Sequence, residues 1–384
     1  MKVAIITITD GANYGNRLQN YALQQVLTSL GVSCETLNRL TSRDPSIIRK
    51  VGALIKDTIR FLLHKKTNHI YRVRRKRFKK YNKQSICWSK FTLQKNSAPK
   101  ELDNEYDFFI CGSDQIWNVK FDVIQEDIMN YLASFASPSK RISYAASFGT
   151  SSIDKKYIPL FEQELANFKS ISVREETGVQ LVKSLANREA QLVLDPTMLL
   201  TAKEWDCSSK KPDFVSSEEK FIVTYFMSGR NDLLNSHIRH IQQSFECQRV
   251  IHLDMEFCDR SSITDEKAFC ATPDEFLWLI SHSEAVLTDS FHATVFSILF
   301  HKPYCVYERK AKEKDNKMSS RIDTLLEYFN MNSFKDDIDN PHIIPQKYNK
   351  DSTEHTLEFR RASSISFLQN ALSLTKDNEQ EEIL

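Results

Sequence analysis

The chain opens with a strand, a polar turn, a helix and a second strand, and this order constrains the fold more than any other feature. Residues 3–8, VAIITI, form a short apolar run rich in β-branched side chains, which is typical of a buried strand. From Asn16 to Leu30 apolar side chains recur at helical spacing, and VSCETL at 32–37 follows Gly31 as the next strand. Strands joined through a helix lie parallel in one sheet, so the sequence predicts an α/β fold.

The same alternation stops at a polar linker and then restarts. Buried strands are predicted at 106–112 and 221–226, and Thr272-Pro-Asp-Glu275 is a capping box that predicts a helix over 273–282. Two α/β units predict two Rossmann-like domains facing a cleft, with ligands at the carboxyl ends of the strands. The expected divisions are an N-terminal domain at 1–200 with a basic helical insertion near 45–84, a linker at 201–220, a C-terminal domain at 221–350, and a C-terminal helix with an acidic tail at 351–384.

Glycine usage excludes several common enzyme classes. The 384 residues include only eight glycines, and no two of them form the G-x-G of a dinucleotide site. A phosphate-binding P-loop, H-E-x-x-H, G-x-S-x-G and C-x-x-C are absent from the sequence as well. The histidines have no ligand-like spacing, so we expect neither a metal nor a bound cofactor. The N-terminus lacks the pattern of a signal peptide, which predicts a cytoplasmic protein.

The charge of the chain is uneven although its net value is small. Between Arg49 and Lys83 there are fourteen Lys or Arg and one acid, Asp57, so this segment carries +13 and the remaining chain −11 of the net +2. Apolar side chains recur at helical spacing from Ile47 to Leu63, ahead of the basic run from Arg72 to Lys83. An apolar stripe followed by cations is typical of a helix on an anionic membrane surface, and a helix packed on its own domain is the alternative. Nucleic acid is not expected, because few aromatic side chains interleave with the basic run.

Two polar turns follow predicted strands and offer groups for sugar hydroxyls. The first begins the helix after strand 3–8, where backbone N–H groups and amide side chains bind hydroxyls or anions. The second, GSDQIWN at 112–118, places amide and carboxylate groups beside an aromatic ring, a combination that suits carbohydrate. A helix cap and an Asx-turn with a core tryptophan are the structural alternatives. The residues expected to bind an acceptor are Asn13, Tyr14, Gly15, Asn16, Gln19, Gly112, Ser113, Asp114, Gln115 and Trp117.

His292 and Arg174 are the candidates for phosphate chemistry. His292 begins a helix directly after the strand at 285–289, where the helix dipole favours the neutral ring unless an anion is bound. Such a histidine is well placed to act as an acid toward a phosphate ester. Arg174 follows a strand, and its guanidinium can recognise phosphate or carboxylate in the same cleft. A packed histidine and an ion pair of Arg174 with Glu175 or Glu176 are the structural alternatives.

Six segments in order and spacing resemble the polysaccharide pyruvyl transferase family over most of the chain. This resemblance implies a GT-B-like pair of domains and transfer of the pyruvyl group of phosphoenolpyruvate onto two hydroxyls of a sugar. The product is a cyclic ketal, and phosphate is released. The segments are GNRLQNYALQ (15–24), CGSDQIWN (111–118), YAASFG (144–149), SVREETG (172–178), LDPTML (194–199) and TDSFHATVFSI (288–298).

The resemblance also implies roles for individual residues. Arg174 matches a family arginine associated with phosphoenolpyruvate, and Ser290-Phe291-His292 matches an R-[LF]-H motif whose arginine is missing here. Arg321, in MSSRIDTLL, is the candidate to replace that arginine on the donor. His292 is expected to act as the acid, and either Asp114 or Asp289 as the base.

The implied setting is bacterial capsule or exopolysaccharide synthesis. Phosphoenolpyruvate is then a co-substrate, the acceptor is a lipid-linked oligosaccharide, and the protein lies at the inner face of the cytoplasmic membrane. The residues themselves are also consistent with two other functions. One is a GT-B glycosyltransferase that uses a nucleotide sugar, and the other is a non-catalytic member that binds glycan or anion. The sequence does not identify the acceptor sugar or the oligomeric state.

Overall fold

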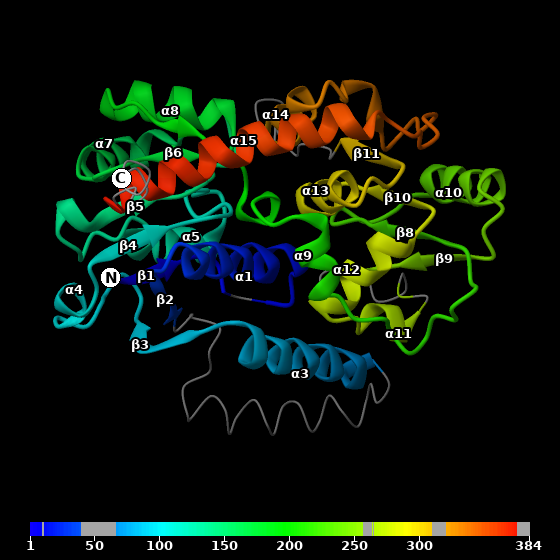
Figure 1. Ribbon diagram of the computed structural model, residues 1–384, viewed down its shortest axis with the longest axis horizontal. Helices are drawn as coiled ribbons and strands as arrows, with labels where there is room; N and C mark the ends of the chain where they lie inside the picture. The colour runs from blue at the N-terminus through cyan, green and yellow to red at the C-terminus, as the bar shows by residue number, and fades with distance from the viewer. Residues whose placement is uncertain (10, 40–66, 256–262, 264, 309–319, 375–384) are drawn as a thin grey trace, which may run out of the picture.

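The computed structural model describes residues 1–9, 11–39, 67–255, 263, 265–308 and 320–374. Figure 1 shows two α/β halves side by side, and helix α15 (Lys350–Ala371) crosses from the second half back to the first. Within the described residues each half is built on a five-stranded parallel sheet, which confirms the predicted α/β class with two Rossmann-like units. The residue boundaries expected for the domains remain predictions.

The first sheet has the strand order β3-β2-β1-β4-β5, and all of its strands run parallel. Its central strand is buried from Val3 to Ile6, because both faces of a parallel sheet are covered. A short parallel pair, β6 with β7, continues this side of the molecule. The bounds are β1 Lys2–Ile6, β2 Ser33–Arg39, β3 Trp88–Leu93, β4 Phe108–Cys111, β5 Arg141–Ser143, β6 Ser172–Val173 and β7 Gln191–Leu192.

The second sheet has the order β12-β11-β10-β8-β9 and is also parallel throughout. Its central strand β10 is fully apolar except for its last residue, Thr288, and leads directly into helix α13. The carboxyl end of this strand therefore delivers the start of α13 to the edge where α/β folds bind ligands. The bounds are β8 Phe221–Tyr225, β9 Arg249–His252, β10 Ala285–Thr288, β11 Tyr304–Glu308 and β12 Lys335–Asp337.

The helices cover both sheets (Figure 1). Helix α12 has the bounds expected from its capping box, in which Thr272 and Glu275 bond each other's backbone. The α-helices are α1 Tyr14–Ser29, α3 Thr67–Ser85, α4 Leu102–Glu105, α5 Asp122–Gln125, α6 Ile128–Tyr131, α7 Ile158–Ala166, α8 Glu176–Ala186, α9 Ala202–Cys207, α10 Asp232–Ser244, α11 Glu266–Phe269, α12 Pro273–His282, α13 Phe291–Leu299, α14 Ser320–Tyr328 and α15. The 3-10 turns are η1 Pro138–Lys140, η2 Lys155–Tyr157, η3 Pro196–Met198 and η5 Asn332–Phe334.

One apolar core runs through both halves. Tyr14, at the start of α1, is fully buried and stacks on Phe276 of α12 with ring centroids 4.5 Å apart. Its edge also meets Tyr225 of β8 at 5.4 Å. Burial of large aromatic rings is worth several kcal/mol, so this contact holds α1 firmly against the second half.

Helix α3 comes from the first half by sequence but packs on the second. Arg74 is fully buried and donates hydrogen bonds to the backbone carbonyls of Ala12, at 3.1 Å, and of Phe269. Arg77 Nη2 lies 2.5 Å from Glu275 Oε1 on α12. The basic run from Arg72 to Lys83 is thus part of a helix, as expected, and its buried face joins the two halves.

Strand β7 is only two residues long, and the chain turns soon after it, where Asp195 caps the 3-10 turn η3 and Pro196 begins it. The apolar stripe from Ile47 to Leu63 lies outside the described residues. None of the described helices combines the length and apolar character that a bilayer span requires.

Candidate functional site

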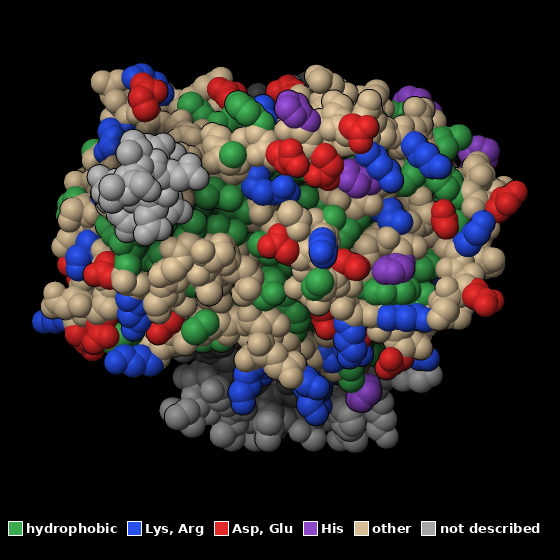
Figure 2. All heavy atoms as spheres, viewed as in Figure 1, with side chains coloured by type: hydrophobic (Ala, Val, Ile, Leu, Met, Phe, Trp, Pro, Cys, Tyr) green, Lys and Arg blue, Asp and Glu red, His purple; other side chains and the backbone are tan. Residues whose placement is uncertain are grey.

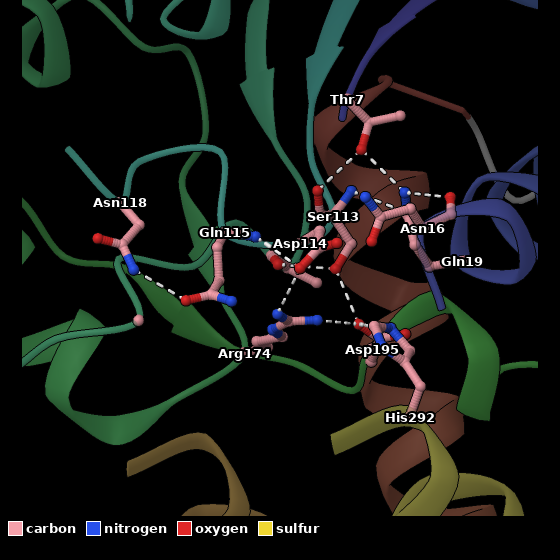
Figure 3. A network of polar contacts seen from close by, with 12 residues as sticks. Thr7, Asn16, Gln19, Ser113, Asp114, Gln115, Asn118, Arg174, Asp195 and His292 are labelled. Atoms are coloured by element: carbon pink, nitrogen blue, oxygen red, sulfur yellow. Dashed lines mark hydrogen bonds and ion pairs between the residues drawn. The ribbon is translucent and has the colours of Figure 1, made fainter. Parts of the chain in front are cut away.

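Five elements bring polar side chains together at the seam between the two halves (Figure 3). Asp114 follows β4, Arg174 follows β6, Asp195 follows β7, and Gln19 projects from α1. His292 reaches the same place from the start of α13 in the second half. Carboxyl ends of parallel strands converge at one edge of a sheet, and this explains why residues so distant in sequence meet.

Arg174 is the centre of this network. Its side chain is fully buried, and Nη1 donates to Asp195 Oδ2 at 2.6 Å while Nη2 donates to Asp114 Oδ1 at 3.0 Å. A third carboxylate, that of Glu175, lies 4.0 Å from Nε. Burying a guanidinium is costly unless acids neutralise it, so these contacts fix the loops after β4, β6 and β7 against one another. The ion pair with Glu175 that the sequence left open is present, but two other acids lie closer.

Asp195 is a site residue that sequence reasoning did not single out. Its Oδ2 accepts hydrogen bonds from Arg174 and from Ser113 Oγ at 2.9 Å, and its Oδ1 accepts from the Thr197 hydroxyl at 2.7 Å. Burial raises the pKa of Asp195, but the neighbouring His292, Arg174 and Thr197 outweigh burial and hold the pKa below its ordinary value. The signal for it was present in LDPTML, where an aspartate directly follows an apolar strand.

His292 faces Asp195 across the seam. Its Nε2 lies 3.8 Å from Asp195 Oδ2 and has no hydrogen-bond partner within the described part of the chain, although the residue is only 7% exposed. Burial lowers the pKa of His292, and the charges of Asp195 and Asp114 oppose that effect without cancelling it. The ring is therefore neutral near pH 7, and an added anion favours its protonated form.

Gly15 of α1 lies directly against the His292 ring. A Cβ built on Gly15 would stand 2.1 Å from Nδ1 of His292, which no real contact permits. Four residues along the same helix, Gln19 joins α1 to the 112–118 turn, because its Nε2 donates to Thr7 Oγ1 at 2.8 Å and its Oε1 accepts from the Ser113 N–H at 3.1 Å. The turn, the helix and the histidine are thus held in one arrangement.

Phe291 lies between the two arginines of the predicted donor side. Its ring centroid is 4.6 Å from Cζ of Arg174 and 6.0 Å from Cζ of Arg321. Arg321 comes from α14, is 5% exposed, and is close enough for its charge to lower the pKa of His292. Ser290 is the N-cap residue of α13, so the backbone N–H groups of this helix start beside the same ring. All four predicted donor residues therefore lie close to His292.

Glu175 is a second acid that sequence reasoning mentioned only as an ion-pair partner. It is fully buried, and its Oε1 accepts the backbone N–H groups of Phe148 at 2.9 Å and Gly149 at 3.2 Å. Burial raises the pKa of Glu175, and the charges of Arg174 and Arg321 offset this only in part. Three acids thus surround Arg174, and the charge of Arg321 acts on Glu175 and His292.

Asp289 accepts hydrogen bonds from the turn that follows β8. Its Oδ1 accepts the Met227 N–H at 2.7 Å, and its Oδ2 accepts the Ser228 N–H at 2.9 Å as well as the Ser228 hydroxyl. Both carboxylate oxygens are therefore used to hold the turn after β8. This arrangement favours Asp114 over Asp289 as the residue that can act on a substrate.

Three predicted acceptor residues lie in the core. Trp117 is fully buried between Phe148 and Phe168, so its indole presents no open face to a sugar. Tyr14 is enclosed by aromatic side chains at the seam, as described above. Gly112 has a φ of +132°, and a Cβ there would stand 2.0 Å from the Tyr144 carbonyl oxygen, so glycine is required for the turn itself.

Among the remaining predicted acceptor residues, only Asn13 and Gln115 are partly exposed at the rim. The others are buried, namely Gly15, Asn16, Gln19, Ser113 and Asp114. Gln115 is partly exposed, and its Oε1 accepts a hydrogen bond from Asn118 Nδ2 at 2.8 Å. Asn13 is also partly exposed and caps α1 by accepting the Asn16 N–H at 3.3 Å. Amide side chains of this kind can exchange such local bonds for bonds to hydroxyls. In the described residues, no group of three or more His, Cys, Asp or Glu could hold a metal ion.

The fold and the seam network define an α/β protein of two Rossmann-like halves with a buried acid–base and arginine cluster between them. The sequence profile of the polysaccharide pyruvyl transferases matches residues 13–310. This span includes the whole network from Gly15 to His292. The chain therefore belongs to the polysaccharide pyruvyl transferase family.

Comparison with other proteins adds similarity of fold. No curated protein matches the sequence. Solved structures that align with the chain include the UDP-GlcNAc 2-epimerase of Methanocaldococcus jannaschii, with 11% identity, 94% of this chain and 93% of that chain covered, and a TM-score of 0.48. The ADP-heptose lps heptosyltransferase II of E. coli aligns with 10% identity, 97% and 99% coverage, and a TM-score of 0.36. Likeness at this level carries no inference about what this chain binds.

Proposed function

We propose that the chain transfers the pyruvyl group of phosphoenolpyruvate onto two hydroxyls of one sugar in a polysaccharide or lipid-linked oligosaccharide precursor. A cyclic ketal forms and phosphate leaves. The observation that carries this proposal is His292, a buried histidine whose Nε2 has no hydrogen-bond partner among the described residues and which faces an ionised aspartate. It lies within the residues matched by the family.

We propose that the donor binds at the start of α13. Phosphoenolpyruvate carries about three negative charges, which arginines and the N–H groups of a helix N-terminus stabilise. Arg321 and the first turn of α13 supply these groups beside Phe291. Arg174 already neutralises Asp114 and Asp195. Its main role here is therefore to hold those acids in place.

His292 acts as the acid in the first step. A proton passes from the ring to the methylene carbon of the donor, which becomes a methyl group, and positive charge develops on the neighbouring carbon. One sugar hydroxyl forms a C–O bond to that carbon and gives its proton to a base. The second hydroxyl then bonds to the same carbon as the C–O bond to phosphate breaks, and its proton passes to the departing phosphate.

Asp114 is the proposed base. Its Oδ1 accepts hydrogen bonds from Arg174 Nη2 and from the Gln115 N–H, whereas none of the hydrogen bonds within the described residues uses Oδ2. That oxygen is therefore available for a hydroxyl proton. Gln115 and Asn13 at the rim are proposed to orient the sugar.

The exposed face of α3 is proposed to place the protein on an anionic inner leaflet, where lipid-linked acceptors are found. Helix α3 contains no acid, and its exposed side chains include Lys76, Lys79, Lys80 and Lys83. Each cation near an anionic surface contributes about 1 kcal/mol. Replacing these four lysines by glutamine should abolish flotation with anionic vesicles at low salt. Replacing the exposed Lys155, Lys156 and Lys203 should not, and equal behaviour of the two variants would contradict docking through α3.

Donor choice tests the proposed reaction against glycosyl transfer. We expect phosphoenolpyruvate to raise the thermal unfolding midpoint of the wild-type protein, because a ligand that binds only the native state stabilises it. Nucleotide sugars should give no shift. Stabilisation by a nucleotide sugar and none by phosphoenolpyruvate would contradict the proposal.

A further inference from the structure

Gly15 differs from most other glycines of the described chain in the reason for its presence. Gly11, Gly31, Gly112, Gly149 and Gly229 have positive φ values, which by themselves favour glycine. Gly15 instead lies inside α1 with helical backbone, a conformation that alanine prefers. The obstacle to a side chain at this position is the His292 ring, since a Cβ would lie 2.1 Å from Nδ1, 2.4 Å from Cγ and 2.7 Å from Cε1.

We propose that Gly15 is a positioning residue for His292. By lacking a side chain, it lets the imidazole lie against α1 with Nδ1 on the glycine side and Nε2 toward Asp195. This orientation presents Nε2 to a donor at the start of α13. The inference rests on the proposed function, in which His292 delivers a proton.

The contacts around Gly15 indicate which group would move if a methyl group were added there. Helix α1 cannot move away from α13 easily, because the adjacent Tyr14 is stacked on Phe276 at 4.5 Å and Gln19 is bonded to Thr7 and Ser113. The ring of His292 turns about two single bonds at far lower cost. A methyl group at Gly15 is therefore expected to rotate the imidazole rather than displace the helix.

The contact also crosses the seam between the halves. Gly15 comes from the first half and His292 from the second, so the acid is correctly oriented only when the halves are packed together. Through Gly15, the first half thus contributes to protonation of the donor without supplying the atom that gives the proton. A displacement of about 1 Å can cost ~10²-fold in rate, which sets the size of the expected effect.

The test is Gly15→Ala, alone and combined with His292→Ala. Turnover with phosphoenolpyruvate should fall by ~10²-fold with donor affinity nearly unchanged, because the acid moves while the arginines stay. In the wild-type background Gly15→Ala should lower the thermal unfolding midpoint. In the His292→Ala background it should raise the midpoint, since the overlap is gone and alanine favours the helix.

Gln25→Ala, on the exposed face of α1, is the matched control and should act alike in both backgrounds. Undiminished turnover of Gly15→Ala, or the same change of midpoint with and without the His292 ring, would overturn the inference. The unfolding measurement needs no substrate. A wild-type protein without pyruvyl transfer but with the reversal of sign would therefore reject the proposed function and leave the Gly15–His292 contact established.

Discussion

Arg174 and Asp195 form a fully buried ion pair in which Nη1 of the arginine lies 2.6 Å from Oδ2 of the aspartate. The two residues follow the adjacent strands β6 and β7, so their pairing links the loops that leave one sheet edge. The same aspartate oxygen lies 3.8 Å from Nε2 of His292. One carboxylate thus connects the arginine cluster of the first half with the histidine of the second.

Replacing Asp195 with asparagine tests this connection. The substitution keeps the shape of the side chain but removes the charge that opposes the effect of burial on His292. The pKa of His292 should therefore fall further. The alkaline limb of the kcat profile, where the acid loses its proton, should move to lower pH with a ~10–10²-fold loss of rate near pH 7. Asp213→Asn, an exposed acid, is the control. A pH profile that matches the wild type would show that Asp195 does not control the pKa of His292.

Arg321 is expected to contribute strongly to donor affinity, although it lies outside residues 13–310, which match the family. Arg321→Gln should weaken phosphoenolpyruvate binding by ~30–150-fold, the usual effect of losing a charge-assisted contact to an anion. The binding constant can be measured by calorimetry. Arg360→Gln, on α15 next to Tyr328, serves as a control for loss of an arginine at a helix surface. Unchanged donor affinity in Arg321→Gln would place the anion elsewhere.

Donor binding should be accompanied by proton uptake. Burial keeps the pKa of His292 below its ordinary value, so near pH 7 the ring starts neutral. An anion of about three charges placed beside it raises that pKa and draws a proton from the solvent. Asp195, Asp114, Arg174 and Arg321 also face the ring and contribute to the balance. Calorimetry in two buffers of different ionisation enthalpy measures the uptake, and an equal uptake by His292→Asn would show that another group takes the proton.

Arg74 should stabilise the packing of the two halves. In Arg74→Met the backbone carbonyls of Ala12 and Phe269 lose a charged donor in a buried place, which costs about 2–4 kcal/mol. Arg77→Gln removes an ion pair whose arginine side chain is 41% exposed, and it should cost under about 1 kcal/mol. Urea unfolding of the two variants compares them. Equal losses of unfolding free energy in the two variants would mean that the burial of Arg74 adds no stability.

The α/β class with parallel sheets and several individual elements could be predicted, because they follow from local patterns. The capping box at Thr272 predicted where α12 begins, and the apolar run at 285–289 predicted β10 and the position of His292 just after it. These signals depend on residues within one or two turns of each other. Nothing in them requires knowledge of the other half of the chain.

The pairing across the seam could not be predicted in the same way. Asp195 acquires its role only when β6 and β7 bring Arg174 beside it and α13 brings His292 from about a hundred residues away. The sequence around Trp117 fits a sugar-binding ring and a core residue equally well. Only its packing against Phe148 and Phe168 shows that the ring is fully buried. Local composition carries no information on such distant contacts.

Product mass is the most direct test of pyruvyl transfer. The wild-type protein is incubated with phosphoenolpyruvate and either a panel of aryl hexosides or extracted lipid-linked oligosaccharide, and both mass and released phosphate are measured. The account predicts a product heavier than the acceptor by pyruvic acid less one water, one phosphate released for each product, and a ~10²–10⁴-fold slower reaction with His292→Asn. Phosphate release without any gain of acceptor mass, or full product formation by His292→Asn, would contradict it.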